Sequence, residues 1–434
     1  MLAAVGFILI VIMVALIMSG KIALPPILIL LPVIASLVLG YGFKDIKGFL
    51  DTGLGSVLNT AVLFSFAVIY FNVLGDAGMF DLIVGKVMQY IGNSIPLVLI
   101  MTCLLTMISH LDGSGATTML ITIPTMLPLF QKMKIKPTWL LFYVGLVSGV
   151  ENMLPWTSAQ ARVAAATNVD AYEIWRMVLP IQIVGFVILL ASCFFIGNYL
   201  KRQGCGVSDE EFAELKQGIV KEKEPVLKVS KTVMAIDIIM TIVLVLAMLF
   251  KLINTNLAFM VGLSIALILN CKSAKEQTAQ IKKHGSNALN MVMMIFAIGV
   301  LVGTLKDTGM MQAMTDALLG ILPKSAGRHI PMIVALFSVP LSMAVGSDTV
   351  YMVMTPIFGQ MAMAYGGTME AAVIGALIGS CIAANLCLVG PTPYLALGLA
   401  GVDMKDNLRA NFLPTWILGI VLALVAGVLG VIPF

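Results

Sequence analysis

Long apolar segments recur along almost the whole of this 434-residue chain. Hydrophobic residues make up 60% of the sequence and charged residues only 11%, whereas soluble domains carry about 25% charged residues. Many of the segments reach or approach the ~20 residues that a helix needs to cross a hydrocarbon core of ~30 Å. The sequence therefore predicts an all-α polytopic protein that passes several times through the plasma (inner) membrane and has the lipid bilayer as its surroundings.

The chain also consists of two similar halves. Three short pieces of the first half return in the second at spacings of 231 or 233 positions: residues 75–79 (GDAGM) return as 306–310 (KDTGM), Gly113-Ser114 as Gly346-Ser347, and Val169-Asp170 as Val402-Asp403. One such match arises easily by chance, but three at nearly one spacing indicate an internal duplication. Two like halves with polar, glycine-containing breaks at membrane depth are typical of secondary transporters.

Each half contains a pair of apolar runs that are too short to cross the membrane comfortably. We expect these pairs to form re-entrant helical hairpins over residues 96–130 and 330–365, where non-helical backbone is tolerated only against protein or a water-filled cavity. Five transmembrane helices, one of them interrupted, plus one hairpin per half give an odd number of crossings. The sequence thus predicts two inverted-topology repeats, over residues 1–199 and 232–434.

Between the repeats lies the one clearly aqueous stretch, residues 200–231. Ser208 and Glu211 match a capping box there and predict the start of a short helix. Most Lys and Arg residues fall in this stretch or in loops that would share its side of the membrane. The positive-inside rule therefore makes 200–231 a cytoplasmic linker and places the N- and C-termini outside the cell. The third apolar run of each half is expected to span the membrane at 57–74 and 287–305.

Both hairpin tips carry an aspartate among glycine and hydroxyl residues. An ionisable group at membrane depth is costly and is therefore a functional candidate. A tip also ends one half-helix and starts another, so it offers carbonyl groups to a cation and free N–H groups to an anion. The candidate residues are Asp112, Gly113, Ser114, Gly115, Thr117 and Thr118 at the first tip, and Gly346, Ser347, Asp348 and Thr349 at the second. The alternative for each aspartate is a turn or N-cap residue that only closes the hairpin.

An interrupted helix in each half supplies the other wall of the expected site. Pro155 lacks a backbone donor and breaks the first of these helices, and Asn152 lies beside the break. Asn385, Gly390 and Thr392 mark the equivalent break in the second half. Because a broken helix exposes backbone and side-chain polar groups at membrane depth, we expect Asn152, Pro155, Asn385 and Thr392 to contribute to binding the transported solute.

Three further polar residues near the first tip have two interpretations each. Arg162 could give a carboxylate a bidentate partner, or its side chain could extend to lipid headgroups. Glu151 is either a proton-binding carboxylate, with Asp112 and Asp348 as the other coupling-ion candidates, or a satisfied buried acid. His110 could titrate near neutral pH, but it is interpreted as a cap or surface group.

Several other classes of function are not supported. The sequence has no Gly-x-x-x-x-Gly-Lys-Ser/Thr motif for ATP, no selectivity-filter repeat and no His-Glu-x-x-His zinc motif. Its basic residues are scattered among loops, so no nucleic-acid partner is expected, and its six cysteines show no metal-type spacing. Asp112 and Asp348 could formally act as the pair of an intramembrane aspartyl protease, but their Gly/Ser-rich setting favours solute coordination. We therefore expect a transporter and not an enzyme.

Three stretches resemble the metal-citrate/proton symporter (CitMHS) family. Residues 111–118 (LDGSGATT) are similar to the first hairpin tip of that family, 153–156 (MLPW) with 161–163 (ARV) to its first broken helix, and 394–403 to the region after its second break. The similarity covers essentially the whole chain. The resemblance implies the ion transporter superfamily fold, in an inverted-repeat and usually homodimeric carrier with an elevator-type transport domain. It also implies proton-driven uptake of a di- or tricarboxylate, typically citrate complexed to a divalent metal.

The two tips depart from the pattern of that family. Ser114 stands where a second aspartate is usual, and Gly346-Ser347-Asp348 stands where Ser-Asn-Asp is usual. Because hard cations prefer acidic oxygen ligands, the missing carboxylate leaves free citrate, other carboxylates and sodium coupling open. We expect an H+-coupled secondary active symporter for citrate or a related di-/tricarboxylate, with a Na+-coupled carrier of another small organic anion or a passive anion channel as alternatives. No bound cofactor is expected, and Mg2+ or Ca2+ would enter only as part of the transported complex.

Overall fold

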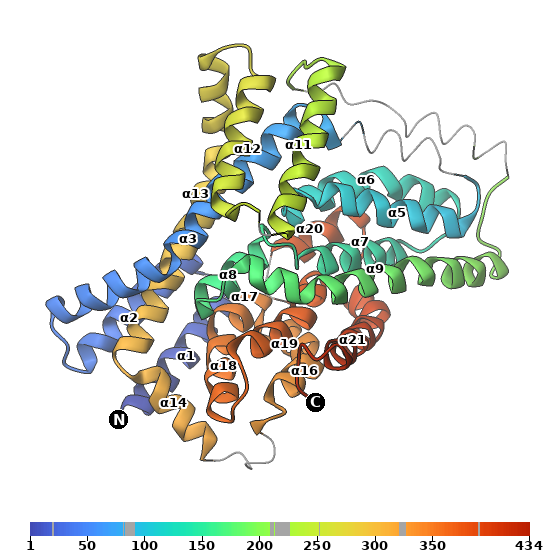
Figure 1. Cartoon of the computed structure of the whole chain (residues 1–434). Helices are drawn as coiled ribbons and strands as arrows, with labels where there is room; N and C mark the ends of the chain where they lie inside the picture. The colour runs from blue at the N-terminus through green and yellow to red at the C-terminus, as the bar shows by residue number, and fades with distance from the viewer. Residues whose placement is uncertain are drawn as a thin grey trace.

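The computed structural model describes residues 1–19, 21–80, 82, 92–208, 212, 226–250, 252–320, 327–388 and 391–434. Within these residues every regular element is a helix (Figure 1). The all-α prediction is therefore confirmed.

Both halves of the described chain are built from helices. The first half contains α1 (Leu2–Ser19), α2 (Leu24–Val38), α3 (Phe43–Asp76), α5 (Ile95–Ser109), α6 (Gly115–Lys132), α7 (Pro137–Glu151), α8 (Ser158–Thr167) and α9 (Ala171–Arg202). The second contains α11 (Lys231–Leu249), α12 (Thr255–Asn270), α13 (Ala274–Asp307), α14 (Met310–Leu319), α16 (Ile330–Val345), α17 (Ser347–Thr349), the π-helix Val350–Met354, α18 (Thr355–Ala364), α19 (Met369–Ile382), the 3-10 helix Ala383–Leu386, α20 (Pro391–Ala400) and α21 (Met404–Val428). Helices α3 and α13, which end at the two copies of the 75–79 motif, both have 34 residues.

Among the described residues, six helices are long and apolar enough to cross a membrane: α3, α9, Lys231–Met248, α13, Met369–Leu386 and α21. Five shorter apolar helices accompany them, namely Leu2–Ile17, α2, α5, α12 and α16. This set confirms a multi-pass membrane protein. The insertion of the two repeats in opposite orientations and the position of the termini stay predictions.

Helices α3 and α13 extend beyond the apolar runs from which they were predicted. They begin at Phe43 and Ala274, well before the expected spans at 57–74 and 287–305. Capping hydrogen bonds at the two N-termini explain the extension. Asp45 accepts a hydrogen bond from the backbone N–H of Gly42, and the Ser273 side chain accepts one from the N–H of Glu276. A capped polar turn can continue an apolar helix past the hydrocarbon boundary, so hydropathy alone marks too late a start.

The helices form two groups that mix both halves of the chain. The scaffold group, α1–α3 with α11–α14, is built around α3 and α13, which lie side by side (Figure 1). Helix α2 packs on α13 and helix α12 on α3, so the second helix of each half packs against the long helix of the other. The close approach relies on glycine: a Cβ on Gly299 would lie 2.9 Å from the backbone oxygen of Gly53, and one on Gly303 would lie 2.7 Å from its Cα. Small residues allow such backbone contact between membrane helices.

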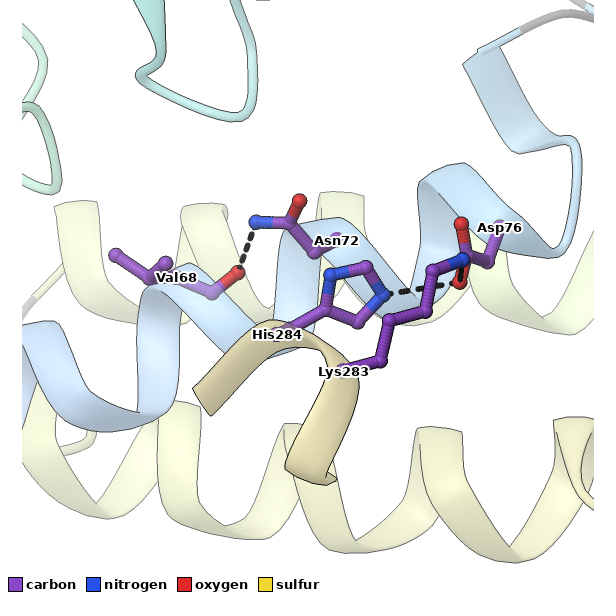
Figure 2. Close-up of polar contacts among 5 residues, drawn as sticks. All are labelled: Val68, Asn72, Asp76, Lys283 and His284. Carbon is purple, nitrogen blue, oxygen red and sulfur yellow. Dashed lines mark hydrogen bonds and ion pairs between the residues drawn. The ribbon is translucent and has the colours of Figure 1, made fainter. Parts of the chain in front are cut away.

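A charged cluster joins the two long helices near the end of α3. The Asp76 carboxylate accepts hydrogen bonds from Lys283 Nζ at 2.5 Å and from His284 Nε2 at 2.9 Å (Figure 2). The backbone N–H of Leu227 donates to the carbonyl of Asp76 at 2.9 Å, which fastens the end of the 200–231 linker to the scaffold. The start of the linker is held by Gly206, whose N–H donates to the Met133 carbonyl at 2.9 Å. The helix predicted to start at Ser208 lies outside the described residues.

The second group, which we call the site group, contains α5–α9 and α16–α21. Helices α5 and α6 pack on each other and on α7, and α16 and α18 pack on each other and on α19. The turns that join these pairs contain Gly113 with φ 73° and Gly346 with φ 90°, values that glycine adopts without strain. The pairs correspond to the expected hairpins 96–130 and 330–365, and their re-entrant insertion stays a prediction.

Candidate functional site

A cavity of about 210 Å³ lies in the site group where elements of both halves meet. The turn after α5, the start of α6, the α7–α8 break, α17, the π-helix, the 3-10 helix and the start of α20 all contribute to its wall. The lining residues are His110, Gly115, Met119, Ser148, Asn152, Ser158, Ala159, Arg162, Ser347, Asp348, Tyr351, Ala384, Asn385, Cys387, Thr392 and Pro393. Seven predicted site residues are among them: Gly115, Asn152, Arg162, Ser347, Asp348, Asn385 and Thr392.

An ion pair between the two halves lines this cavity. Arg162 Nη1 on α8 lies 2.5 Å from Asp348 Oδ1 on α17, and the two side chains are 22% and 30% exposed. The Nε atom of Arg162 is buried and has no hydrogen-bond partner among the described residues. The guanidinium therefore faces the cavity and the protein, and its binding of a substrate carboxylate stays a prediction.

Three helices of ten or more residues begin at the cavity wall. Gly115 is the first residue of α6, Ser158 and Ala159 are the first two of α8, and Thr392 and Pro393 follow the first residue of α20. The starts of α6 and α20 are in close contact, because a Cβ on Gly115 would lie 3.2 Å from Thr392 Cγ2. The free N–H groups and the positive dipole end of a helix favour an anion. The wall thus combines three such helix starts with one guanidinium.

The first tip is fixed by bonds among its own residues. The Ser114 side chain caps α6 by accepting from Thr117 N–H at 3.3 Å and from Thr117 Oγ1 at 3.0 Å. Asp112 Oδ1 accepts from the N–H of Ser114 at 2.8 Å, which is the turn geometry of the alternative interpretation. Trp156 Nε1 donates to the Leu111 carbonyl at 2.9 Å and fastens the tip to the α7–α8 break. Asp112, Gly113, Ser114 and Thr117 therefore shape the tip and are not among the lining residues.

The two tip aspartates differ in their surroundings. At the spacing of 233 that aligns Ser114 with Ser347, Asp348 corresponds to Gly115, and Asp112 corresponds to Val345. Accordingly Asp112 stabilises a turn, whereas Asp348 faces Arg162 in the cavity. Ser347 Oγ donates to the Ser380 carbonyl at 3.0 Å and holds the second tip against the end of α19.

His110 is a site residue that the sequence interpretation missed. It is the C-cap residue of α5, as expected, but it is fully buried and lines the cavity, so the expectation of a surface group is wrong. Its Nδ1 lies 2.7 Å from Thr118 Oγ1 and its Nε2 lies 3.1 Å from Asn152 Oδ1, so it joins the first tip to the α7–α8 break. Its place directly before Leu111-Asp112, at the end of an apolar run, was the available signal. Ser148, Ser158, Tyr351 and Cys387 were also missed, because nothing in their local sequence marks them.

The asparagines of the two breaks occupy related positions. Asn152 and Asn385 are 233 residues apart, and both line the cavity. Asn385 Nδ2 donates to the Gly145 carbonyl at 3.0 Å and to Ser148 Oγ at 3.1 Å, which joins the second break to α7 of the first half. Gly390, also expected at this break, lies outside the described residues.

The remaining predicted residues lie around the cavity rather than in its wall. Glu151 at the end of α7 is 3% exposed, and its Oε2 has no hydrogen-bond partner in the part of the chain that the structure describes. Pro155 lies in the α7–α8 break, Gly346 forms the turn after α16, and Thr349 at the end of α17 is fully buried. Among the described residues no group of three or more His, Cys, Asp and Glu side chains is placed to hold a metal ion.

Comparison with known proteins identifies relatives along the whole chain. Residues 1–284 match the family model described as "Citrate transporter" (CitMHS). The chain is 33% identical over 446 residues to a citrate transporter of Bacillus subtilis (strain 168), with 100% of both chains covered. It is 32% identical over 412 residues to the Mg(2+)/citrate complex secondary transporter of the same organism, covering 94% of this chain and 93% of the relative. These relatives are transporters, which supports the expectation that the chain is not an enzyme.

Two solved transporters share the fold at low sequence identity. The Alcanivorax borkumensis YdaH transporter is 12% identical with a TM-score of 0.55, and 89% of each chain is covered. Neisseria gonorrhoeae MtrF is 14% identical with a TM-score of 0.56, with 89% of this chain and 83% of that one covered. The sequence resemblance, the family match and the long relatives agree, and the chain belongs to the citrate transporter (CitMHS) family of membrane proteins.

Proposed function

We propose that this protein is a secondary active symporter that brings citrate, or a closely related di- or tricarboxylate, into the cell together with protons. In this proposal the substrate binds in the cavity of the site group, either as the free anion or as its complex with a divalent metal. The metal then belongs to the transported complex and is not a resident cofactor.

The observation that carries the proposal is the composition of the cavity wall. A guanidinium, three helix starts and the side chains of Asn152, Asn385, Ser158 and Thr392 meet in one cavity. Arg162 offers planar donors that match a carboxylate, and the helix starts offer N–H groups to further carboxylates. A compact anion with several carboxylates and a hydroxyl uses all of these groups at once. The names of the two long relatives point to the same class of substrate.

The candidate proton carriers are the carboxylates at and beside the cavity. Asp348 lines the cavity, and Glu151 is buried next to Asn152, which lines it. Asp112 remains a third candidate, although its carboxylate also closes the first tip. Buried carboxylates in membrane carriers commonly act as proton relays because their charge is costly there.

Transport requires the cavity to open to each side of the membrane in turn. We propose that the site group moves as a unit against the scaffold group, in an elevator-type motion, with the two hairpins entering from opposite faces. The groups meet mainly through α8 against α3 and α13 and through α18 against α14. This motion, an extracellular position of both termini and a homodimer are parts of the proposal.

Uptake of radiolabelled citrate into proteoliposomes tests the function. We expect accumulation above the external concentration when an inward proton gradient is imposed, and loss of this accumulation with a protonophore. Magnesium, calcium and sodium are varied independently at fixed pH, so that dependence on sodium instead of protons would identify the Na+-coupled alternative. Flux that only follows the citrate gradient in every condition would show a channel and overturn the proposal.

A further inference from the structure

The Arg162–Asp348 ion pair has a consequence for the form of the substrate. Both side chains line the cavity, and among its described lining residues they are the only arginine or lysine and the only aspartate or glutamate. In the structure, the carboxylate of Asp348 occupies the guanidinium to which the substrate carboxylate would bind. A carboxylate substrate must therefore share Arg162 with Asp348 or displace it.

We infer that Asp348 is the residue that makes this site prefer a metal–citrate complex over the free anion. The inference rests on the proposed function. Fully ionised citrate places three carboxylates beside Asp348, and like charges repel strongly in a site shielded from water. In a complex with a divalent cation, the metal neutralises most of this charge and accepts an oxygen ligand from Asp348. Asp348 then exchanges Arg162 for the metal, and Arg162 is released to a citrate carboxylate.

The geometry makes this exchange a small movement. Asp348 is the middle residue of the three-residue helix α17, which begins directly after Gly346. Arg162 Nη1 donates to one oxygen of the Asp348 carboxylate, Oδ1. Ser347 is bonded to the Ser380 carbonyl at 3.0 Å, so the tip stays in place while the neighbouring side chain turns. Arg162 also has donor capacity to spare, because its Nε is buried without a hydrogen-bond partner among the described residues.

The first half offers no equivalent acid at the matching position. Gly115 stands at the position that corresponds to Asp348, and the Asp112 carboxylate accepts from the N–H of Ser114 in its own tip. The metal ligand from the protein therefore comes from the second tip. The metal takes its remaining ligands from citrate and water, which is the common arrangement for Mg2+.

Binding to the purified full-length protein tests the inference, with citrate measured by isothermal titration calorimetry in EDTA and again in excess Mg2+. For the wild type we expect tighter binding in Mg2+. Asp348→Asn should lower this Mg2+ preference at least tenfold, because metal-free citrate is no longer repelled and the metal loses an anionic ligand. Asp348→Glu, which restores the charge, should recover most of the preference. Asp403→Asn is the matched control, since Asp403 is exposed at the start of α21 and its side chain makes no capping bond.

The double variant Arg162→Gln/Asp348→Asn separates a specificity role from a purely structural pair. If the pair only stabilises the fold, the double variant should bind like the wild type, whereas our inference predicts that it binds neither form. Should Asp348→Asn not fold, as judged by size-exclusion chromatography, Asp348→Ser takes its place with the same expectation. A folded variant whose Mg2+ preference stays within twofold of the wild type would overturn the inference. Wild-type protein that binds neither form of citrate would instead overturn the proposed function.

Discussion

At the scale of single residues, the charged groups of the site divide into those that face the cavity and those that hold its walls. Arg162 and Asp348 face the cavity and each other, whereas Asp112 closes a turn. Composition does not separate the two tip aspartates, since both sit beside glycine and serine. Their bonding partners do separate them, since Asp348 pairs with Arg162 and Asp112 accepts from the N–H of Ser114. The roles of Arg162 and of the buried acid Glu151 can be tested by mutation.

Arg162→Lys keeps the positive charge but loses the planar pair of donors. We expect the KM for citrate uptake to rise about tenfold with a smaller change in kcat, because the lost interaction is a charge-assisted bidentate contact to the bound carboxylate. Arg176→Lys is the control, since Arg176 is 41% exposed and pairs with Glu173 on its own helix. An unchanged KM for Arg162→Lys would remove this residue from the binding site.

Glu151→Gln tests whether this buried acid carries a coupled proton. An uncompensated buried charge is expensive, and Oε2 of Glu151 has no hydrogen-bond partner among the described residues. We expect the amide variant to fold normally and to exchange citrate for citrate, but to lose accumulation driven by a proton gradient. The measurement compares exchange with net uptake in the same proteoliposomes, with exposed Glu173→Gln as the control. Full proton-driven accumulation by Glu151→Gln would assign the coupled proton to another group.

At the scale of elements, glycine decides how closely the two long helices approach. The backbones of α3 and α13 are in contact at Gly53, Gly299 and Gly303. The charged cluster of Asp76, Lys283 and His284 adds a polar link farther along the same helix pair (Figure 2). The scaffold group is therefore held by backbone packing at one point and by charge at another.

Gly303→Ala should separate these helices and lower stability. The added Cβ would lie 2.7 Å from Gly53 Cα, which neither backbone can avoid without moving, and overpacking of this kind costs about 1–3 kcal/mol. Thermal unfolding in detergent measures the change. Gly285→Ala on the same helix is the control, because its Cβ meets nothing within 4 Å and alanine favours helix. Equal melting temperatures for the two variants would contradict this packing.

At the scale of the whole molecule, the two halves build one site from unequal contributions. The first half supplies the guanidinium and the starts of α6 and α8, and the second supplies Asp348 and the start of α20. Each half also completes the other in the scaffold, where α2 packs on α13 and α12 on α3. The lining residues come from both halves, so neither half alone forms the cavity.

Single cysteines at Ser114 and Ser347 test the proposed orientation of the hairpins. In a background that lacks the six native cysteines, we expect a membrane-impermeant thiol reagent to label the two positions from opposite faces, or to switch accessibility when citrate is added. The assay uses right-side-out and inside-out vesicles. Labelling of both positions from one face, with and without citrate, would count against inverted hairpins.

Much of the fold and part of the site could be predicted from the sequence, because they depend on local properties. Hydropathy identifies membrane helices, and the recurring Gly-Ser at 113–114 and 346–347 marks both tips, where glycine is needed for positive φ. Seven predicted site residues line the cavity, because the glycine-rich tips and the polar helix breaks that contain or adjoin them are visible in the sequence. The polar starts of α3 and α13 were missed because capping, not hydropathy, extends those helices.

The sequence by itself determined a helical membrane protein with polar breaks, since these follow from residue type and spacing along the chain. Only the tertiary structure decided which polar groups meet. Arg162 and Asp348 are 186 positions apart, His110 joins a tip to a distant break, and Asp112 turns back into its own loop. Contacts between distant segments depend on how helices pack, and packing is a property of the whole molecule that no local pattern contains.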